Sequence, residues 1–574
     1  MVARPTPQRE HRSVSAAAPL PDQLKRVLYS VVLAMTHQRS LVNFVENVFG
    51  LDDAQVSSPI WLRQIIIGYF CIVASIEVTV MPDSIFENGV SSTDASVREQ
   101  LRIRAHAAIP GGAHTYAKGD DQFPVSAPAF IAKGLGCHVW DTEGTEFIEY
   151  GMGLRSVGLG HAFPPVIEAA AAELQHGSNF TRPSPLEVEC AESLLEVIPG
   201  AEMVKFTKDG STATTAAIRL ARAYTGRDIV ALCSDHPFYS YDDWAIGTSQ
   251  MPAGIPEETK DLTLTFRYND LTSVAVLFAL YPGRIAAIIL EAEKDVPPTE
   301  GFLEGIRQLC TSNGTLLILD EMITGFRWPT RTAQNFYKVT PDLSTFGKAL
   351  GNGFAISALA GKREIMMQGG RDHDKERVFL LSTTHGAETH ALAAALAVMK
   401  VYREEAVIET LERQGDRLKA GVDAAAARHG LSQLFKLAGR PSNLVYSCCD
   451  GDGIPSQPYR TLFLQELCRH GIIAPSLVTS YSHSDDDIDQ TIDAVDQALH
   501  VYRKALEDGI DTYLIGRPVR PVFNRYGDRT SSGTTAPTGA QITKTLLRPR
   551  RKPRASNTAA GNRRNSRCAE STIG

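Results

Sequence analysis

The sequence predicts an α/β protein: a parallel sheet covered by helices on both faces, followed by a smaller α+β domain. Short apolar runs are bounded by turn residues, helical segments separate several of them, and the chain becomes rich in helix from about Leu392. Strands that are buried on both faces read as such continuous apolar runs. The runs are Met203–Phe206, Ile229–Leu232, Ile285–Leu290 and Leu316–Leu319, and two of the helical segments are Ala213–Tyr224 and Leu303–Cys310.

The smaller domain is predicted from the C-terminal third. After the helix-rich stretch come strand-like segments at Asn443–Ser447 and Ile472–Ser476, and then a closing helix in DDDIDQTIDAVDQALHVYRKALEDG. The mixture of long helices with short strands is typical of an α+β domain.

Both ends of the chain are expected to lie outside this fold. Near the start, the uncharged part of the apolar stretch Ile60–Val80 is only the 12 residues Ile65–Ile76. A membrane span needs roughly 20 apolar residues, so a packed helix or strand is favoured over a membrane-associated segment. The tail 528–574 is rich in Pro, Ser and Arg and is expected to be disordered, because it has little to bury.

Composition and charge are those of a soluble globular protein. The chain has 574 residues, of which 43% are hydrophobic and 21% charged, with a net charge of −7. From Gln541 to Gly574 there are nine basic residues against one acidic residue, which leaves about −15 on the rest. We therefore expect no nucleic-acid partner and no membrane association for the body.

The nine cysteines are scattered singly apart from Cys448–Cys449. Their spacing matches neither a zinc site nor a disulfide framework. We therefore expect no metal and a reducing cytoplasm.

Three segments that follow predicted strands carry chemistry. Asp209–Thr212 precedes a helix, and such a turn suits a phosphate, although Ser211 and Thr212 also fit as ordinary N-caps. Asp320 ends the strand of TLLILDEMITGFR, and Lys348 lies in the Gly-rich segment STFGKALGNG. A phosphate cradle, a carboxylate for a pyridine nitrogen and a lysine in an apolar setting are what pyridoxal phosphate requires.

The chain resembles the class III, fold type I aminotransferases, within them the glutamate-1-semialdehyde 2,1-aminomutase-like branch. The likeness lies in IPGGAHTYAKGDDQ, WDTEGTEFIEYGMGLRSVGLGHAFPPV, RLARAYTGRD, LLILDEMITGFR and TPDLSTFGKALGNG, and it runs from about Ser96 to Gly527. It implies a large, mainly parallel seven-stranded sheet domain at 166–398. It also implies a small domain built from 93–165 and 399–527, with an extension of unknown role at 1–92.

The resemblance implies pyridoxal 5'-phosphate as cofactor, with Lys348 forming the Schiff base and then acting as general base and acid. Asp320 would keep the pyridine nitrogen protonated, and Met322 would lie beneath the ring. The residues expected to hold the phosphate are Gly210, Ser211 and Thr212.

Further contacts are implied by the same resemblance. Phe238 is expected to stack on the ring, with Tyr239 and Glu291 beside the cofactor. Thr384 would reach the phosphate of a partner subunit, so a homodimer with a shared active site is expected.

The chain departs from the aminomutase pattern where the substrate should bind. Lys118 stands where an arginine binds the substrate carboxylate in the aminomutases, and lysine lacks the two-pronged grip of arginine. Glu388 stands where Asn is common. Arg155 is a candidate replacement contact for an anionic substrate, although a structural salt bridge fits it equally well.

Three functions fit the sequence. The favoured one is an aminotransferase that moves an amino group between an amino donor and a ketone or aldehyde. The alternative is an intramolecular aminomutase, and the third is a catalytically silent binding protein. Asp320 and Lys348 are both retained, which argues against the third.

Overall fold

The protein is described by a computed structural model that covers residues 97–236 and 238–522. These residues belong to the second of two units of the chain, which begins at Ala95. The apolar stretch Ile60–Val80 and the basic tail lie outside the described residues. Among those that are described, we find no helix with the length and apolar character of a bilayer span.

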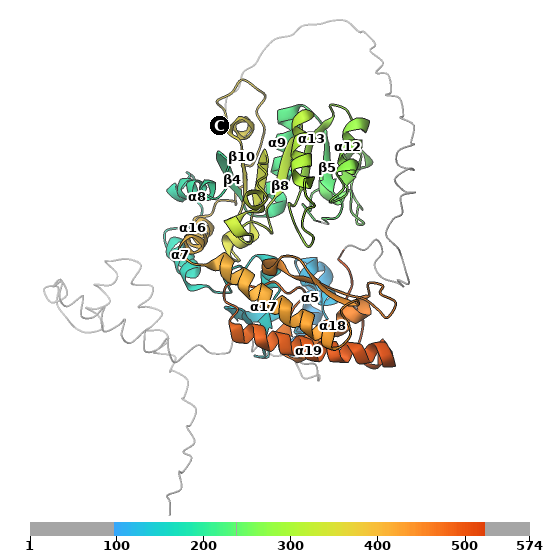
Figure 1. The fold of residues 1–574 in the computed structure, drawn as a ribbon. Helices are drawn as coiled ribbons and strands as arrows, with labels where there is room; N and C mark the ends of the chain where they lie inside the picture. The colour runs from blue at the N-terminus through green and yellow to red at the C-terminus, as the bar shows by residue number, and fades with distance from the viewer. Residues whose placement is uncertain (1–96, 237, 523–574) are drawn as a thin grey trace, which may run out of the picture. The chain divides into compact units, whose positions relative to one another are not determined.

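A seven-stranded sheet confirms the predicted large α/β region (Figure 1). Its strand order is β4-β10-β9-β8-β7-β5-β6. The pairs from β9 to β6 are parallel, whereas β10 runs antiparallel to both β4 and β9. The strands are β4 (Met203–Thr207), β5 (Ile229–Cys233), β6 (Thr263–Phe266), β7 (Ile285–Leu290), β8 (Leu316–Asp320), β9 (Leu343–Phe346) and β10 (Ser357–Gly361).

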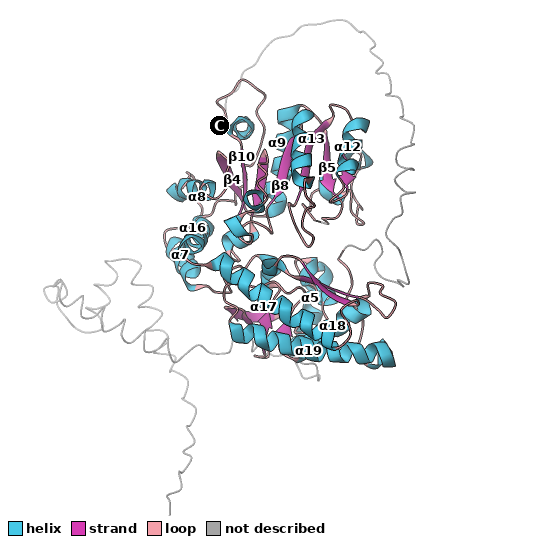
Figure 2. Cartoon of the chain, in the orientation of Figure 1, coloured by secondary structure: helices cyan, strands magenta, loops and turns pink. Residues whose placement is uncertain are grey.

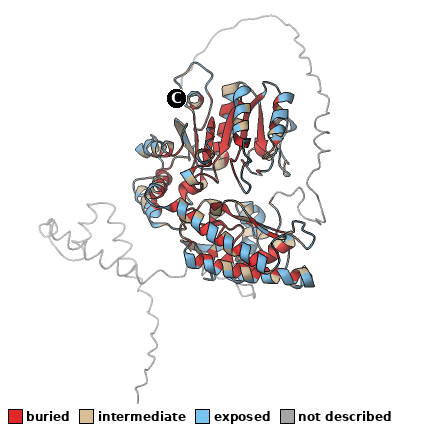
Figure 3. Ribbon diagram, viewed as in Figure 1, coloured by how far each residue is buried: buried red, intermediate tan, exposed pale blue. Residues whose placement is uncertain are grey.

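Helices lie along this sheet because its strands are apolar on both faces. Every residue of β5, β7 and β8 is buried, and Figure 3 shows the strands as the most buried elements. The helix α9 packs on β7, β9 and β10, and α13 packs on β8. The helices of this region are α9 (Gly210–Thr225), α10 (Asp243–Ile246), α11 (Glu257–Lys260), α12 (Leu271–Leu280), α13 (Phe302–Ser312), α14 (Ala333–Phe336) and α15 (Arg363–Met366).

A second, four-stranded sheet pairs strands from the N-terminal and C-terminal parts of the described chain. Its order is β1-β2-β3-β13, and β13 pairs in parallel with β3 although about 320 residues separate them. A two-stranded ribbon, β11-β12, lies in the same C-terminal region (Figure 2). The strands are β1 (Ile131–Leu135), β2 (His138–Asp141), β3 (Glu146–Glu149), β11 (Phe435–Ala438), β12 (Val445–Cys448) and β13 (Ile472–Ile473).

Long helices complete the C-terminal region, as the sequence predicts. The helix α19 packs against both α17 and α18, and α16 packs against α7 and α8. The remaining helices are α5 (Val97–Ala108), α6 (Met152–Arg155), α7 (Pro164–Leu174), α8 (Pro185–Leu195), α16 (Thr389–Glu404), α17 (Val407–Arg428), α18 (Gln457–Arg469) and α19 (Asp485–Asp508).

Candidate active site

Asp320 and Lys348 lie near the carboxyl ends of neighbouring parallel strands. Asp320 is the last residue of β8 and pairs in register with Thr345 of β9. Lys348 begins a 3-10 turn two residues after β9 ends. Parallel strands bring their carboxyl ends to one edge of the sheet, so the topology places the predicted carboxylate and lysine beside each other.

The Asp320 carboxylate belongs to a buried residue, and only one of its two oxygens accepts hydrogen bonds. Its Oδ1 atom accepts hydrogen bonds from the Met322 backbone N–H (3.0 Å) and the Thr345 hydroxyl (3.1 Å). Its Oδ2 atom accepts none from the residues that the structure describes. Burial raises the pKa of Asp320, while the charge of Lys348 and the two hydrogen bonds lower it. The free oxygen is therefore available to a cationic partner.

The Lys348 side chain points into the same buried region with its amine unpaired. The amine forms neither a hydrogen bond nor a salt bridge within the described chain. Burial lowers the pKa of Lys348, whereas the charges of Asp320 and Glu291 raise it. Its backbone has a φ of 45°, a left-handed conformation that is strained for a residue with a side chain and is common at active sites.

The turn in which a phosphate cradle is predicted directly precedes α9. Asp209, not Ser211 or Thr212, is the N-cap, because its carboxylate accepts the Thr212 backbone N–H at 2.9 Å. Ser211 accepts a hydrogen bond from the Tyr241 backbone N–H at 3.2 Å. The first N–H groups of a helix have no partner inside it, and the helix dipole makes this end positive. The turn therefore suits an anion.

Met322 connects the cradle to the lysine. A Cβ atom on Gly210, at the start of α9, would lie 2.8 Å from the Met322 sulfur. A Cβ atom on Gly347, directly before Lys348, would also lie 2.8 Å from that sulfur. The Met322 side chain therefore lies against both the start of α9 and the residue before Lys348.

The segment after β5 exposes one aromatic residue and buries the next. Phe238, the predicted stacking residue, is 51% exposed, whereas Tyr239 is buried. The Tyr239 hydroxyl lies 3.1 Å from Nδ1 of His236, which also accepts the Glu291 backbone N–H at 3.2 Å. Burial lowers the pKa of His236 to about 3, so it is neutral. The sequence did not predict that His236 would hold Tyr239 and Glu291, because a single histidine outside any motif gives no such indication.

Glu291 lies directly after β7 with one oxygen unsatisfied. It is buried, and its Oε2 atom has no hydrogen-bond partner within the described residues. Burial, with a smaller contribution from the charge of Asp320, raises the pKa of Glu291 to about 7. The charges of Lys348 and Arg155 act in the opposite direction, so these groups share the region around Glu291.

Arg155 ends a left-handed turn that lies close to Glu291. The φ angles from Met152 to Arg155 are 43°, 58°, 59° and 71°. The Arg155 Nε donates a hydrogen bond of 2.7 Å to Asn443. Within the described chain Arg155 forms no salt bridge, although the charges of Glu291 and Asp295 raise its pKa against the larger lowering by burial. Asn443, which holds Arg155, was not predicted.

Arg327, the last residue of the DEMITGFR motif, has a structural role. It is fully buried and donates hydrogen bonds to the carbonyls of Ser442 (3.3 Å), Thr479 (3.2 Å) and Arg155 (3.2 Å). Burial lowers its pKa to about 10. It therefore fixes the Arg155 segment to the C-terminal region.

Lys118 and Thr384 lie at the surface of the described chain. Lys118 lines a cavity of about 970 Å³ that also reaches Glu149 and Gly153. The Thr384 side chain is exposed, and its carbonyl accepts a hydrogen bond from Asn179 at 2.9 Å. The buried Glu388 forms a salt bridge with Lys208 at 3.2 Å, which accounts for a carboxylate at that position.

Comparison with known proteins gives consistent matches over this region. The sequence profile of the family Aminotransferase class-III matches residues 116–440. The chain is 34% identical over 413 residues to the glutamate-1-semialdehyde 2,1-aminomutase of Syntrophobacter fumaroxidans, covering 68% of this chain and 94% of that protein. Two solved structures each have a TM-score of 0.65 and cover 71% of this chain. They are the PLP internal aldimine form of FumI from a Sphingopyxis species, 27% identical with 97% of it covered, and an omega-transaminase from Sphaerobacter thermophilus, 26% identical with 98% covered.

Proposed function

The chain belongs to the class III aminotransferase family, and on that premise we propose that it moves an amino group from a donor to a ketone or aldehyde, with Lys348 bearing the cofactor. It is an enzyme that uses pyridoxal 5'-phosphate. The observation that carries the proposal is the pair of unsatisfied groups, the Asp320 Oδ2 atom and the Lys348 amine, at one edge of the sheet.

The residues present fit this cofactor. Asp320 is a buried residue, and its Oδ2 atom, which accepts no hydrogen bond from the described residues, would face a protonated ring nitrogen. Gly210, Ser211 and Thr212 offer a helix N-terminus to the phosphate. When bound, the cofactor supplies an electron sink for the negative charge that develops at the substrate Cα.

The protein's own groups then have separate roles. The Asp320 charge would hold the proton on the pyridine nitrogen, and Met322 would pack against the ring. Lys348 Nζ removes the proton from the substrate Cα, since burial favours the neutral amine that a general base requires. His236 holds both the Tyr239 hydroxyl and the Glu291 backbone N–H, and Tyr239 and Glu291 would lie beside the bound cofactor.

Arg155 is our candidate for an anionic substrate group. Its guanidinium lies near Glu291 and Lys348, and Asn443 accepts from its Nε atom, while no side chain or carbonyl of the described residues accepts from its remaining N–H groups. Lys118 is exposed, so we assign it a minor role.

An intramolecular aminomutase is the second candidate, because the curated relative quoted above carries that name at 34% identity. A screen of amino donors against several aldehydes and ketones separates the two. We expect stoichiometric release of the donor's oxo product. Conversion of glutamate 1-semialdehyde without any net release from a donor would contradict the aminotransferase.

The working unit that we propose is a cytoplasmic homodimer. Thr384 is exposed in the single chain. A residue that completes the phosphate site of a partner subunit has to be exposed in this way. The cysteines of the described residues are all free, which supports a reducing compartment. Sedimentation analysis that gave a monomer with full activity would contradict the shared site.

A further inference from the structure

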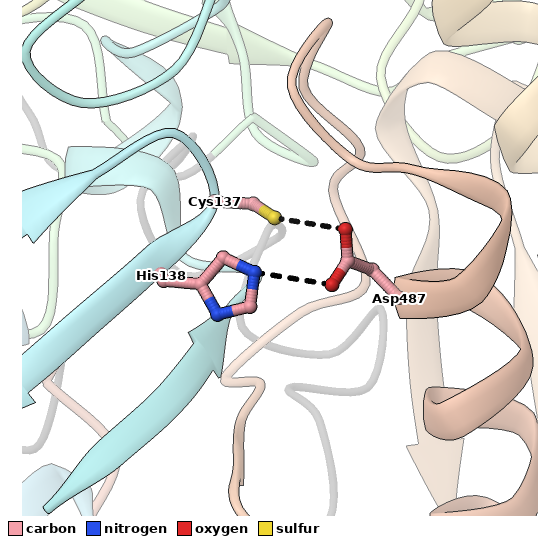
Figure 4. A group of neighbouring side chains, drawn as sticks. All are labelled: Cys137, His138 and Asp487. Atoms are coloured by element: carbon pink, nitrogen blue, oxygen red, sulfur yellow. Dashed lines mark hydrogen bonds and ion pairs between the residues drawn. The ribbon is translucent and has the colours of Figure 1, made fainter.

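Three metal-binding residue types meet outside the residues assigned to the cofactor. Cys137 directly precedes β2, His138 begins β2, and Asp487 lies in the first turn of α19 (Figure 4). One ligand atom from each residue lies within 4.8 Å of the others. Cys137 and Asp487 are 350 residues apart, so no local sequence motif announced the cluster.

The distances within the cluster suit a small divalent ion. The Cys137 Sγ atom lies 3.4 Å from Asp487 Oδ2, and His138 Nε2 lies 3.1 Å from Asp487 Oδ1. Tetrahedral zinc has bonds of about 2.0–2.3 Å, which place its ligand atoms roughly 3.3–3.8 Å apart. The ligand atoms lie within 4.8 Å of one another, so they must approach by up to about 1 Å to reach that geometry.

Neighbouring groups hold two of the three side chains in position. Ser484 donates from its backbone N–H (2.8 Å) and its hydroxyl (2.6 Å) to Asp487 Oδ2, which leaves Oδ1 facing His138. The Glu146 carboxylate lies 2.8 Å from His138 Nδ1. An outer carboxylate on the second ring nitrogen is the usual support of a metal-binding histidine.

We propose that Cys137, His138 and Asp487 bind one Zn²⁺ ion, with a water or the Ser482 carbonyl as fourth ligand. Sulfur, imidazole nitrogen and carboxylate oxygen are the donors that zinc prefers. The Ser482 carbonyl is 3.6 Å from the Cys137 sulfur. The ion joins the start of β2 to α19, so its role is structural and does not involve the transferred amino group.

The competing account is a metal-free ion cluster. In it, the two ring nitrogens of His138 face the carboxylates of Glu146 and Asp487, and the Cys137 thiol donates to Asp487. Both accounts place the Glu146 carboxylate 2.8 Å from Nδ1 of His138, so metal binding itself is what separates them. The side chains of His138 and Asp487 remain 32% and 12% exposed, which leaves an entry path for the ion.

The test uses the full-length holoenzyme, stripped with a chelator and titrated with Zn²⁺ against a chromophoric competitor. We expect one Zn²⁺ per chain. Cys137→Ser and His138→Gln should each weaken binding by more than about 100-fold, and Glu146→Gln by about 10- to 100-fold. The matched controls Cys449→Ser and His176→Gln should bind as the unchanged protein does.

Cobalt gives a second readout that does not depend on affinity. Co²⁺ bound here should show thiolate-to-metal charge transfer and the visible absorption of a tetrahedral site, and Cys137→Ser should abolish the first. His138 is partly exposed, so His138→Gln should fold even if Cys137→Ser does not. The proposal would be overturned if the unchanged protein bound no stoichiometric Zn²⁺, or if Cys137→Ser and His138→Gln bound it as tightly as the unchanged protein does. Either result would leave the metal-free cluster.

Discussion

Asp320 and Lys348 stabilise each other's charged forms from the ends of adjacent strands. Burial alone would neutralise both groups, because it raises the pKa of the carboxyl and lowers that of the amine. The charge of each group opposes this effect on the other. Burial remains the larger effect, so the pKa of Asp320 is still raised and that of Lys348 still lowered.

Asp320→Asn should lower kcat by about a hundred- to a thousandfold, because the charge that holds the ring proton is lost. Thr345→Val is the matched control: it removes one hydrogen bond to Asp320 and should cost about tenfold or less. Steady-state rates, normalised to cofactor content, measure both. Equal rates for Asp320→Asn and the unchanged enzyme would exclude a pairing of Asp320 with the ring nitrogen of the cofactor.

Arg155→Ala should raise KM for an anionic substrate by roughly ten- to a hundredfold, the effect of losing a charge-assisted hydrogen bond. Lys118→Ala should change KM by about threefold or less, because Lys118 is exposed. The reverse order, with normal cofactor spectra, would assign substrate binding to Lys118 and favour an amino-acid-like substrate.

His236 should make the protein sensitive to acid. Its pKa is about 3 in the folded protein against the usual 6.5, so the unfolded chain binds more protons between these values. Stability therefore falls as pH drops from 6.5 towards 3, by up to about 1.4 kcal/mol per pH unit. His236→Gln should flatten the fall of the thermal midpoint across this range. Parallel curves for the two proteins would contradict a buried neutral histidine.

Glu291 should act in the opposite direction. Its pKa is about 7 in the folded protein against the usual 4.5, so the folded state binds more protons in that window. The contribution of Glu291 to the free energy of unfolding is therefore fully present below pH 4.5 and is lost as pH rises towards 7. Glu291→Gln should therefore gain stability relative to the unchanged protein between pH 4.5 and 7. A constant difference across this range would show that Glu291 is ionised throughout.

A chain of residues 95–522 should remain folded and yellow, because every residue assigned to the cofactor lies within it. Cofactor content per chain, compared with that of the full-length protein, is the measurement. Loss of cofactor from the shortened chain would assign residues 1–94 or the basic tail a part in the site.

The sequence predicted best what local patterns encode. The run Ile285–Leu290 coincides with β7, since a continuous apolar run has few alternatives. In contrast, β6 was missed because Thr263–Phe266 is short and only partly buried. The strand predicted at Ile472–Ser476 ends after Ile473, because Pro475 lacks the N–H that would extend the ladder.

Partners far apart in the chain were beyond prediction. His236 binds the Glu291 backbone across 55 residues, and Asn443 holds Arg155 across 288. Such contacts depend on how the elements pack, which no local spacing encodes. The roles of Asp320 and Lys348 were accessible because each follows a strand of one parallel sheet.

Borohydride reduction of the holoenzyme, followed by peptide mapping, tests the central claim most directly. Reduction fixes the cofactor to the amine that holds it, and we predict the phosphopyridoxyl group on Lys348 in the peptide that contains STFGKALGNG. Lys348→Ala should retain no fixed cofactor after reduction. A label on any other lysine of the unchanged protein would contradict the assignment of Lys348 and, with it, the account of the site.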